Sequence, residues 1–266
     1  VIISTYNSPD WLRKVLWGYN TQTYRNFEVV IADDGSRDDT RQMLADIASE
    51  MFFPIVHTWH EDNGFQKCTI LNKAIMACST DYILMSDGDC IPRPDFVEQH
   101  IKFREEGFFL SGGYHKLPMD LSQKISREDI YSGRCFEMGW LRRNGMPSSF
   151  KNNKVDAYGL KSNMLNALTP TNPSWNGHNA SGWKEDILAV NGFDERMQYG
   201  GEDRELGERL MNNGIKPKQI RYSTVCLHLD HKRGYDTPES IEKNKAIRKT
   251  TRDEKRVWTD YGIVKK

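Results

Sequence analysis

The chain has 266 residues, of which 38% are hydrophobic and 11% aromatic, so it is long and apolar enough to bury a large core. Its 37 lysine and arginine residues balance its 37 aspartate and glutamate residues, which argues against a dedicated nucleic-acid binder with its basic excess. The five cysteines are odd in number and form no CxxC pair, so we expect reduced thiols in a cytoplasmic protein.

The first part of the chain alternates short apolar runs with amphipathic segments. The runs predict strands at residues 1–5, 27–32, 54–59 and 82–85. Apolar residues at helical spacing follow the runs, for example Met43, Leu44 and Ile47, and Ser8 with Pro9 is a favourable helix start. Such alternation is typical of βαβ units, so the predicted fold is α/β, with a mostly parallel central sheet and helices on both faces.

The second part has weaker periodicity. We expect one more strand at 108–113, then an insert at 114–173 on the rim of the crevice, with helices near 126–143 and 159–168. The remaining predicted elements are a short helix at 184–190, a helix ending at Asn213-Gly214, a strand at 220–227 and a charged, helix-prone tail from Pro238. The charges of the tail are typical of a solvated face, with a basic membrane-surface helix as the alternative.

The fourth strand stops at two carboxylates, Asp87 and Asp89, separated by one glycine. Ligands of open α/β sheets bind at the carboxyl ends of the strands, so these acids would lie at the mouth of a crevice. Gly88 lets the chain turn, so that one acid can hold a hard divalent cation and the other a ribose or a metal-bound water. The simpler interpretation is a polar turn, because Asp-Gly is ordinary turn chemistry. The chain lacks GxGxxG and GxxxxGK[ST] motifs, which argues against a dinucleotide oxidoreductase and a P-loop enzyme.

Seven short motifs, in order along residues 1–231, resemble the family 2 nucleotide-sugar glycosyltransferases of the GT-A fold. The later ones are similar to β-1,4-galactosyltransferases and bacterial chondroitin-type polymerases. The motifs are Ile2-Ile3-Ser4-Thr5-Tyr6-Asn7, Val30-Ile31-Ala32-Asp33-Asp34-Gly35-Ser36, Asn63-Gly64-Phe65 with Asn72-Lys73-Ala74, Asp87-Gly88-Asp89, Asn191-Gly192-Phe193-Asp194-Glu195, Gly200-Gly201-Glu202-Asp203 and His228.

The resemblance implies one GT-A domain in two halves. Residues 1–113 would form the nucleotide-sugar-binding half, and residues 114–231 would form the acceptor-binding and catalytic half, with its region of helices and loops. Residues 232–266 would form a charged helical C-terminal tail.

The same resemblance implies the donor-binding residues. Thr5 and Tyr6 would line the base, and Asp33 would accept hydrogen bonds from uracil or ribose, although helix capping is the plainer role for its motif. Lys67 would contact the diphosphate, because the basic residue that the family places after Asn-x-Gly is displaced here. The other expected donor-site residues are Asn7, Asn63, Asp87, Gly88, Trp183 and Gly201.

The resemblance implies Mn²⁺ or Mg²⁺ as cofactor. Asp89 would ligate the metal, and His228 would be the second protein ligand, with His231 as a weaker candidate. Imidazole in a mixed nitrogen and oxygen site favours Mn²⁺. A lone histidine after a strand is more often structural, so its place in the family pattern carries this assignment.

The resemblance also implies the catalytic residues. Asp203 would be the general base that activates the acceptor hydroxyl, and Glu202 would hydrogen-bond a sugar; the alternative is that both acids only complement a helix dipole. Trp175, Trp183 and Tyr199 are candidate sugar platforms, and core packing is the alternative for each. Tyr199 and Arg204 replace a tryptophan and an acid of the galactosyltransferase pattern, so the acceptor stays open.

We therefore expect an inverting, metal-dependent transferase that moves a hexose or N-acetylhexosamine from a UDP-sugar to a glycan or lipid-linked glycan in bacterial surface-polysaccharide biosynthesis. UDP-galactose, UDP-N-acetylgalactosamine or UDP-glucose is the expected donor. The alternatives are a retaining transferase, which shares a Gly-Gly-Glu element, and a non-catalytic glycan-binding module. A nucleotidyltransferase would need a glycine-rich loop with arginine after the first strand, which 4–10 lacks.

The expected location is the cytoplasm, with peripheral contact to the inner face of the cytoplasmic membrane if the acceptor is lipid-linked. The sequence shows no apolar run of membrane-spanning length and no signal peptide.

Overall fold

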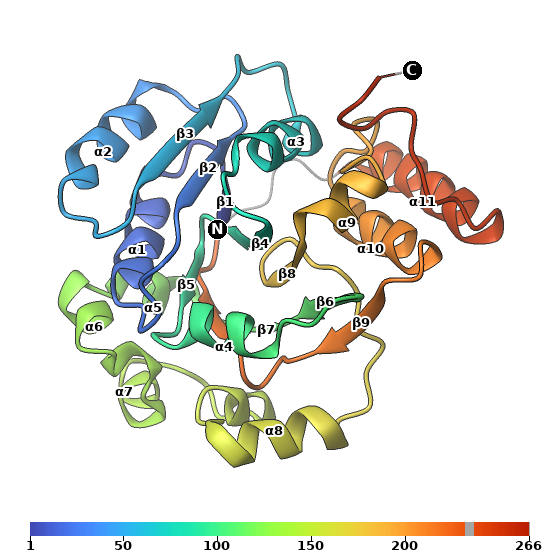
Figure 1. The fold of residues 1–266 in the computed structure, drawn as a ribbon. Coiled ribbons are helices and arrows are strands. Elements are labelled where there is room, and N and C mark those ends of the chain that lie inside the picture. Colours follow the sequence, from blue (N-terminus) through green and yellow to red (C-terminus); the bar gives the residue numbers. More distant parts are fainter. Residues whose placement is uncertain (232–236, 266) are drawn as a thin grey trace.

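The computed structural model in Figure 1 describes residues 1–231 and 237–265. A seven-stranded sheet runs through its centre. In order across the sheet, its strands are β3 (Ile55–Trp59), β2 (Val29–Asp33), β1 (Ile2–Thr5), β4 (Tyr82–Asp87), β8 (Ala180–Trp183), β6 (Phe108–Ser111) and β9 (Lys216–Gln219). Only β8 runs antiparallel to its neighbours among these strands, so the mostly parallel sheet expected from the sequence is confirmed.

Both faces of the sheet are buried, because each strand places alternate side chains in two separate cores. Ile3 and Ile31 point into one core together with α1 (Pro9–Asn20) and α2 (Asp38–Ala48). Ile2 and Val30 point into the other, which holds apolar residues of α3 (Lys67–Ala77), α9 (Lys184–Ala189) and α10 (Glu202–Asn212). The expected helices on both faces of the sheet are therefore present.

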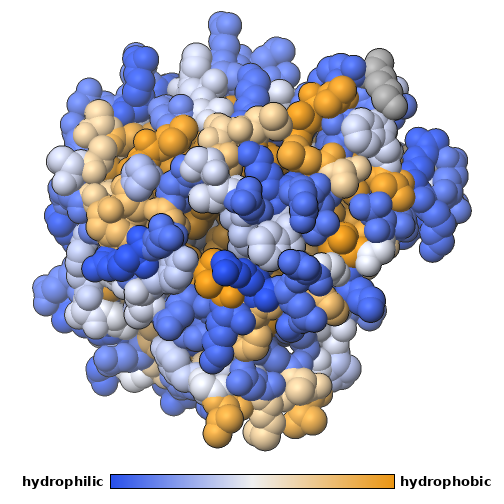
Figure 2. Space-filling model, in the orientation of Figure 1, coloured by the Kyte–Doolittle hydropathy of each residue, from blue (hydrophilic) through white to orange (hydrophobic). Residues whose placement is uncertain are grey.

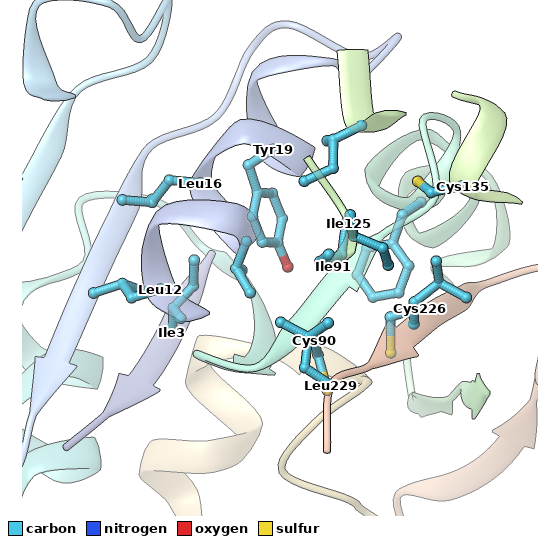
Figure 3. Packing of buried hydrophobic residues seen from close by; sticks show 14 of the residues in the cluster. Ile3, Leu12, Leu16, Tyr19, Cys90, Ile91, Ile125, Cys135, Cys226 and Leu229 are labelled. Atoms are coloured by element: carbon cyan, nitrogen blue, oxygen red, sulfur yellow. The ribbon is translucent and has the colours of Figure 1, made fainter. Parts of the chain in front are cut away.

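In a second sheet of three strands, β10 (Val225–His228) from late in the chain lies beside β5 (Cys90–Pro92), which follows the turn after β4. The strand order of this sheet is β5, β10 and β7 (Gly113–Lys116). Figure 3 shows Tyr19 of α1 pointing toward Ile91 of β5, with Cys226 and Leu229 on the neighbouring segment. β10 pairs antiparallel with β5, and His228 is in register with Cys90.

Two predicted strands are divided in the structure. The predicted strand 108–113 separates into β6 and β7 at Gly112, where a Cβ atom would lie 1.9 Å from Oδ1 of Asn179. The predicted strand 220–227 was wrong in its first half, because the Ile220 carbonyl accepts the N–H groups of Ser223 and Thr224 in a turn. That turn separates β9 in the large sheet from β10 in the small one.

Most helices between β5 and β8 are short. The helical structure predicted near 126–143 is interrupted at Gly133, which has a φ of +74°. The elements are α4 (Phe96–Phe103), α5 (Met119–Lys124), α6 (Arg127–Tyr131), η1 (Arg134–Phe136), α7 (Met138–Arg143), η2 (Phe150–Lys154) and α8 (Gly159–Leu168). Apolar residues lie along the lower edge of the surface in Figure 2, where α8 exposes Leu160, Met164 and Leu168.

The charged tail forms α11 (Pro238–Asp253), as predicted, but this helix is not simply a solvated face. It buries Ser240, Asn244 and Thr251 and packs on α10. Residues 232–236, with which the predicted tail begins, lie outside the described residues. None of the described helices combines the length and apolar character needed to cross a lipid bilayer.

A buried ion pair fixes α10 to the segment that precedes it. Arg209 binds the Glu205 carboxylate at 2.8 Å, and both side chains are 1% exposed. The same guanidinium donates to the carbonyls of Val190 and Gly192, so its donors are paired inside the protein. Thr251 of α11 adds a hydrogen bond of 2.8 Å to Glu205.

We predict that Arg209→Met lowers the free energy of unfolding by about 3–5 kcal/mol, because Glu205 would keep a buried charge without its partner. Urea denaturation followed by circular dichroism measures the change. The double variant Glu205→Leu/Arg209→Met should recover part of the loss, since it removes the charge that is left unpaired. A loss below about 1 kcal/mol for the single variant would contradict the assigned role of the pair.

Candidate active site

One cleft of about 670 Å³ opens at the carboxyl ends of β1 and β4. It brings together residues from the start of the chain, the Asp87-Gly88-Asp89 turn, the start of α10 and the end of β10. The sequence-predicted residues that line it are Thr5, Tyr6, Asn7, Lys67, Asp87, Gly88, Asp89, Tyr199, Glu202, Asp203, His228 and His231.

The turn at Gly88 separates two carboxylates. The Gly88 N–H donates to the Ser4 carbonyl at 2.7 Å, and a Cβ atom at Gly88 would lie 2.9 Å from that oxygen. Because β1 approaches so closely, a side chain at this position would push the turn away from the sheet. The two acids thus face different partners: Asp87 binds Ser4 and Lys67, whereas Asp89 faces two histidines.

The carboxylate of Asp87 is held ionised by its neighbours. Burial alone would raise its pKa, but Lys67 and the Ser4 hydroxyl outweigh burial and lower the pKa far below its usual range. Lys67 donates to Asp87 Oδ1 at 2.9 Å. Burial alone would lower the pKa of the Lys67 ammonium group, but the nearby carboxylates of Asp87 and Glu202 outweigh burial and raise that pKa. The pair therefore keeps one fixed positive and one fixed negative charge at the floor of the cleft.

Asp89 and His228 are suited to hold a divalent cation. The Nε2 atom of His228 lies 3.8 Å from Oδ2 of Asp89, and that of His231 lies 3.1 Å from the same oxygen. The Nδ1 atom of His228 is 2.8 Å from the Leu229 carbonyl, which can only accept, so Nδ1 carries the proton and Nε2 keeps a lone pair. These ligand atoms fit a cation that accepts nitrogen and oxygen, such as Mn²⁺.

Cys90 lies beside this group but is a poor ligand. Its sulfur is within the 4.8 Å cluster formed with Asp89 and His228. Burial raises the pKa of its thiol well above the usual value, so the thiolate that metals bind is disfavoured. All five cysteines are buried and free of disulfides.

One predicted donor-site residue, Asp33, lies outside the cleft. Asp33 is 1% exposed, accepts the Ser36 N–H and pairs with His57, and it is absent from the cleft lining. The next residue, Asp34, lines the cleft instead, held by His60 at 2.7 Å and by the Gln66 N–H at 3.0 Å. Both acids belong to the same motif, and no feature of the motif indicates which of the two lines the cleft.

Four further residues predicted to bind the donor or stack on a sugar do not line the cleft: Asn63, Gly201, Trp183 and Trp175. Asn63 is exposed and outside the cleft lining, where its neighbours Gly64 and Phe65 are found. Gly201 packs against Arg248 of α11, because a Cβ atom placed on Gly201 would lie 3.1 Å from the Arg248 side chain. Trp183 lies at the opposite end of β4, beside Tyr82, with its indole N–H on the Glu105 carbonyl.

Trp175 is also not a sugar platform. It is completely buried, packs on Phe109 and sits against Gly182 and Gly207. A Cβ atom at Gly207 would lie 2.8 Å from the Trp175 Cβ, so α10 approaches the indole closely.

The two acids at the start of α10 face the cleft. The Glu202 side chain is 8% exposed and accepts the Gly200 N–H at 2.9 Å. Burial first, and then the nearby Asp203, raise the pKa of Glu202. Asp203 Oδ2 accepts the Gly177 N–H at 3.2 Å, which joins this end of the cleft to the segment before β8.

His178 and Tyr114 line the cleft although neither was predicted. Their rings meet edge to face at 4.7 Å, and Tyr114 also contacts the ring of His228 at 5.5 Å. Burial lowers the pKa of His178, and the carboxylates of Asp87 and Asp203 oppose this effect. Its segment, Trp175–Trp183, is rich in polar residues and aromatics, which is the only sequence signal that pointed here.

Comparisons with known families cover most of the chain. The model of the family described as glycosyl transferase family 2 matches residues 1–158, and that described as the N-terminal domain of galactosyltransferase matches residues 171–232. The chain is 27% identical to the uncharacterized glycosyltransferase YfnE of Bacillus subtilis (strain 168), over 92% of this chain and 68% of that protein.

Two named synthases are also similar. Chondroitin synthase of Escherichia coli is 25% identical over 80% of this chain and 32% of its own length. Hyaluronan synthase of Pasteurella multocida is 26% identical over 83% of this chain and 23% of its own length. The chain thus spans a third or less of either synthase.

Solved structures share the fold. The mannosyltransferase PcManGT from Pyrobaculum calidifontis, in complex with GDP-Man and Mn²⁺, has a TM-score of 0.58 at 20% identity, covering 88% of this chain and 57% of that one. TarS 1–349 of S. aureus in complex with UDP-GlcNAc has a TM-score of 0.60 at 16% identity, covering 96% and 68%. The expected GT-A architecture is confirmed.

The burial of Trp175 gives a direct test of its role. Trp175→Ala should lower the free energy of unfolding by about 3–5 kcal/mol, because it leaves a large cavity against Phe109 and α10. Tyr199→Ala is the matched control, since Tyr199 lines the cleft, and it should cost less than about 1 kcal/mol. Urea denaturation measures both, and equal costs would show that Trp175 is not a core residue.

Proposed function

The chain belongs to glycosyl transferase family 2, and we propose that it is an inverting, metal-dependent transferase that moves a hexose or N-acetylhexosamine from a UDP-sugar to a glycan acceptor. The observation that carries this proposal is that one cleft is lined by Asp89 and His228 and also by Glu202 and Asp203. A cation-binding pair and a pair of acids in one cleft are what transfer from a sugar diphosphate requires.

The donor would bind along the Asp34 and Lys67 side of the cleft. Thr5, Tyr6 and Asn7 would surround the base, and Asp34, rather than Asp33, would accept a hydrogen bond from uracil or ribose. The fixed ammonium of Lys67 would attract the diphosphate, while Asp87 orients Lys67 and reaches toward the ribose. The match to a galactosyltransferase domain supports UDP-galactose, UDP-N-acetylgalactosamine or UDP-glucose as the donor.

Asp89 and His228 would hold Mn²⁺ or Mg²⁺, with His231 within reach of the same site. A divalent cation supplies positive charge that stabilises the leaving diphosphate. The protein's own contribution is the fixed tautomer of His228, whose proton on Nδ1 is held by the Leu229 carbonyl.

Asp203 would accept the proton of the acceptor hydroxyl, because a hydroxyl with a pKa far above neutrality is a weak nucleophile. Attack by that oxygen on the anomeric carbon forms the new glycosidic bond and breaks the bond to the diphosphate. Attack from the face opposite the leaving group inverts the anomeric centre, so an α-linked donor would yield a β-linked product. Glu202, whose pKa is raised by burial, would hydrogen-bond a sugar hydroxyl.

The acceptor is proposed to be a growing bacterial surface polysaccharide, on the strength of the two synthase relatives. The cytoplasm is the proposed site of action, because nucleotide-sugar donors are made there. A lipid-linked acceptor and contact with the inner membrane face stay expectations from the resemblance alone.

The metal site gives one prediction. His228→Ala should weaken Mn²⁺ binding in the presence of UDP by at least about tenfold, because it removes a proposed protein ligand of the cation. Free Mn²⁺ can be followed by electron paramagnetic resonance, with no need for turnover. His57→Ala is the matched control, since His57 also pairs with an aspartate, Asp33, but outside the cleft. Unchanged Mn²⁺ affinity of His228→Ala would remove His228 from the site.

The proposed general base gives a second prediction. Asp203→Asn should keep donor binding but lower kcat by about 100-fold or more, the usual contribution of a general base. UDP release in the presence of acceptor measures kcat, and NMR of the product reports the anomeric configuration. Glu185→Gln, at the same position in the first turn of α9, controls for the helix dipole and should leave kcat unchanged. Near-wild-type transfer by Asp203→Asn would exclude Asp203 from the mechanism.

A further inference from the structure

A single buried amide holds the loop that leads into α10. The Nδ2 atom of Asn244, on α11, donates to the carbonyls of Gln198, Tyr199 and Gly200 at 2.9, 3.2 and 3.2 Å. Its Oδ1 atom accepts the Gln198 N–H at 3.4 Å. Asn244 is completely buried, so no water competes for these bonds.

The residues around Asn244 cover the same loop. A Cβ atom placed on Gly200 would lie 3.6 Å from the Ile241 side chain, and one placed on Gly201 would lie 3.1 Å from the Arg248 side chain. Positions 241, 244 and 248 lie on one face of a helix, so the side chains on this face of α11 cover both glycines. Arg248 is itself fixed by Glu208 of α10 at 2.6 Å.

The loop needs this support because of its backbone. Gly200 and Gly201 have φ values of +112° and +93°, which only glycine adopts without strain. Glycine also leaves the unfolded loop more conformations to lose, so external bonds are needed to hold one of them.

The loop in turn fixes the two acids of the cleft. The Gly200 N–H binds the Glu202 carboxylate at 2.9 Å, and Asp203 follows directly in the first turn of α10. The carbonyl of the same Gly200 is one of the three that Asn244 holds. A change in the loop would therefore be transmitted to Glu202 and Asp203 through Gly200 itself.

We propose that Asn244 is a positioning residue of the transfer reaction, which sets the place of Glu202 and Asp203 by fixing the backbone of 198–200. It lies outside both matched family segments, 1–158 and 171–232, so a helix beyond the family domains completes the site. The inference rests on the proposed function, because it assumes that these acids contact the substrates. Misplacement of a reacting group by about 1 Å can cost on the order of 100-fold in rate.

The test is Asn244→Leu, which keeps the size of the side chain and removes all four hydrogen bonds. We expect kcat to fall by at least about tenfold, while the KM for the UDP-sugar stays within about twofold and Mn²⁺ binding is unchanged. A merely structural role would lower Tm without this separation of kcat from KM. If Asn244→Leu does not fold, Asn244→Ser, which keeps a polar group but cannot reach three carbonyls, should show the same separation.

Asn212→Leu is the matched control. Asn212 also joins α10 to the α11 end of the chain, donating to the carbonyls of Thr251 and Arg256 at 3.1 and 2.8 Å, but away from the loop. It should lower Tm with kcat unchanged. Wild-type kcat in both Asn244 variants, or an equal fall of kcat in Asn212→Leu, would overturn the proposal.

Asp203→Asn separates this proposal from the proposed function. If Asp203→Asn is inactive and Asn244→Leu is fully active, only the positioning role fails. If Asp203→Asn is itself active, the assignment of the base fails, and the positioning role fails with it.

Discussion

The close approach of Gly88 to the carbonyl of Ser4 is the constraint on which the cleft depends. The hydrogen bond of 2.7 Å between them ties the turn after β4 to the end of β1. Because a glycine fits there, Asp87 is turned toward Lys67 and Asp89 toward the histidines. One backbone contact thereby directs the two acids on either side of Gly88 to different partners, an ion pair with Lys67 and a pair of histidines.

The cleft is completed by polar contacts from elements late in the chain. On one side, β10 brings His228 beside Asp89; on the other, α10 presents Glu202 and Asp203. The packing of α11 on α10 is unusual for a surface helix, because its buried positions are polar: Ser240, Asn244 and Thr251. Hydrogen bonds therefore add fixed directions and partners to the apolar contact that Ile247 of α11 makes with the core.

The sequence predicted the parallel strands and the helices of the first half well, because their apolar residues recur with clear periods, as at Met43, Leu44 and Ile47. It missed β8, whose residues Ala180–Trp183 show no apolar run, and β9 (Lys216–Gln219), and it extended the strand that became β10 back over the turn after Ile220. Short motifs identified most of the residues that line the cleft. They failed where tertiary packing decides direction, as for Asp33 against Asp34 and for the core residue Trp175.

The pairing of β10 with β5 has a consequence for how the protein matures. Side chains alternate along a strand, so a slip of one residue between Cys90 and His228 would turn the imidazole to the opposite face. The two partners are far apart along the chain, and contacts of that kind form slowly. His228 therefore comes to lie beside Asp89 only after β10 has docked on β5 in the correct register.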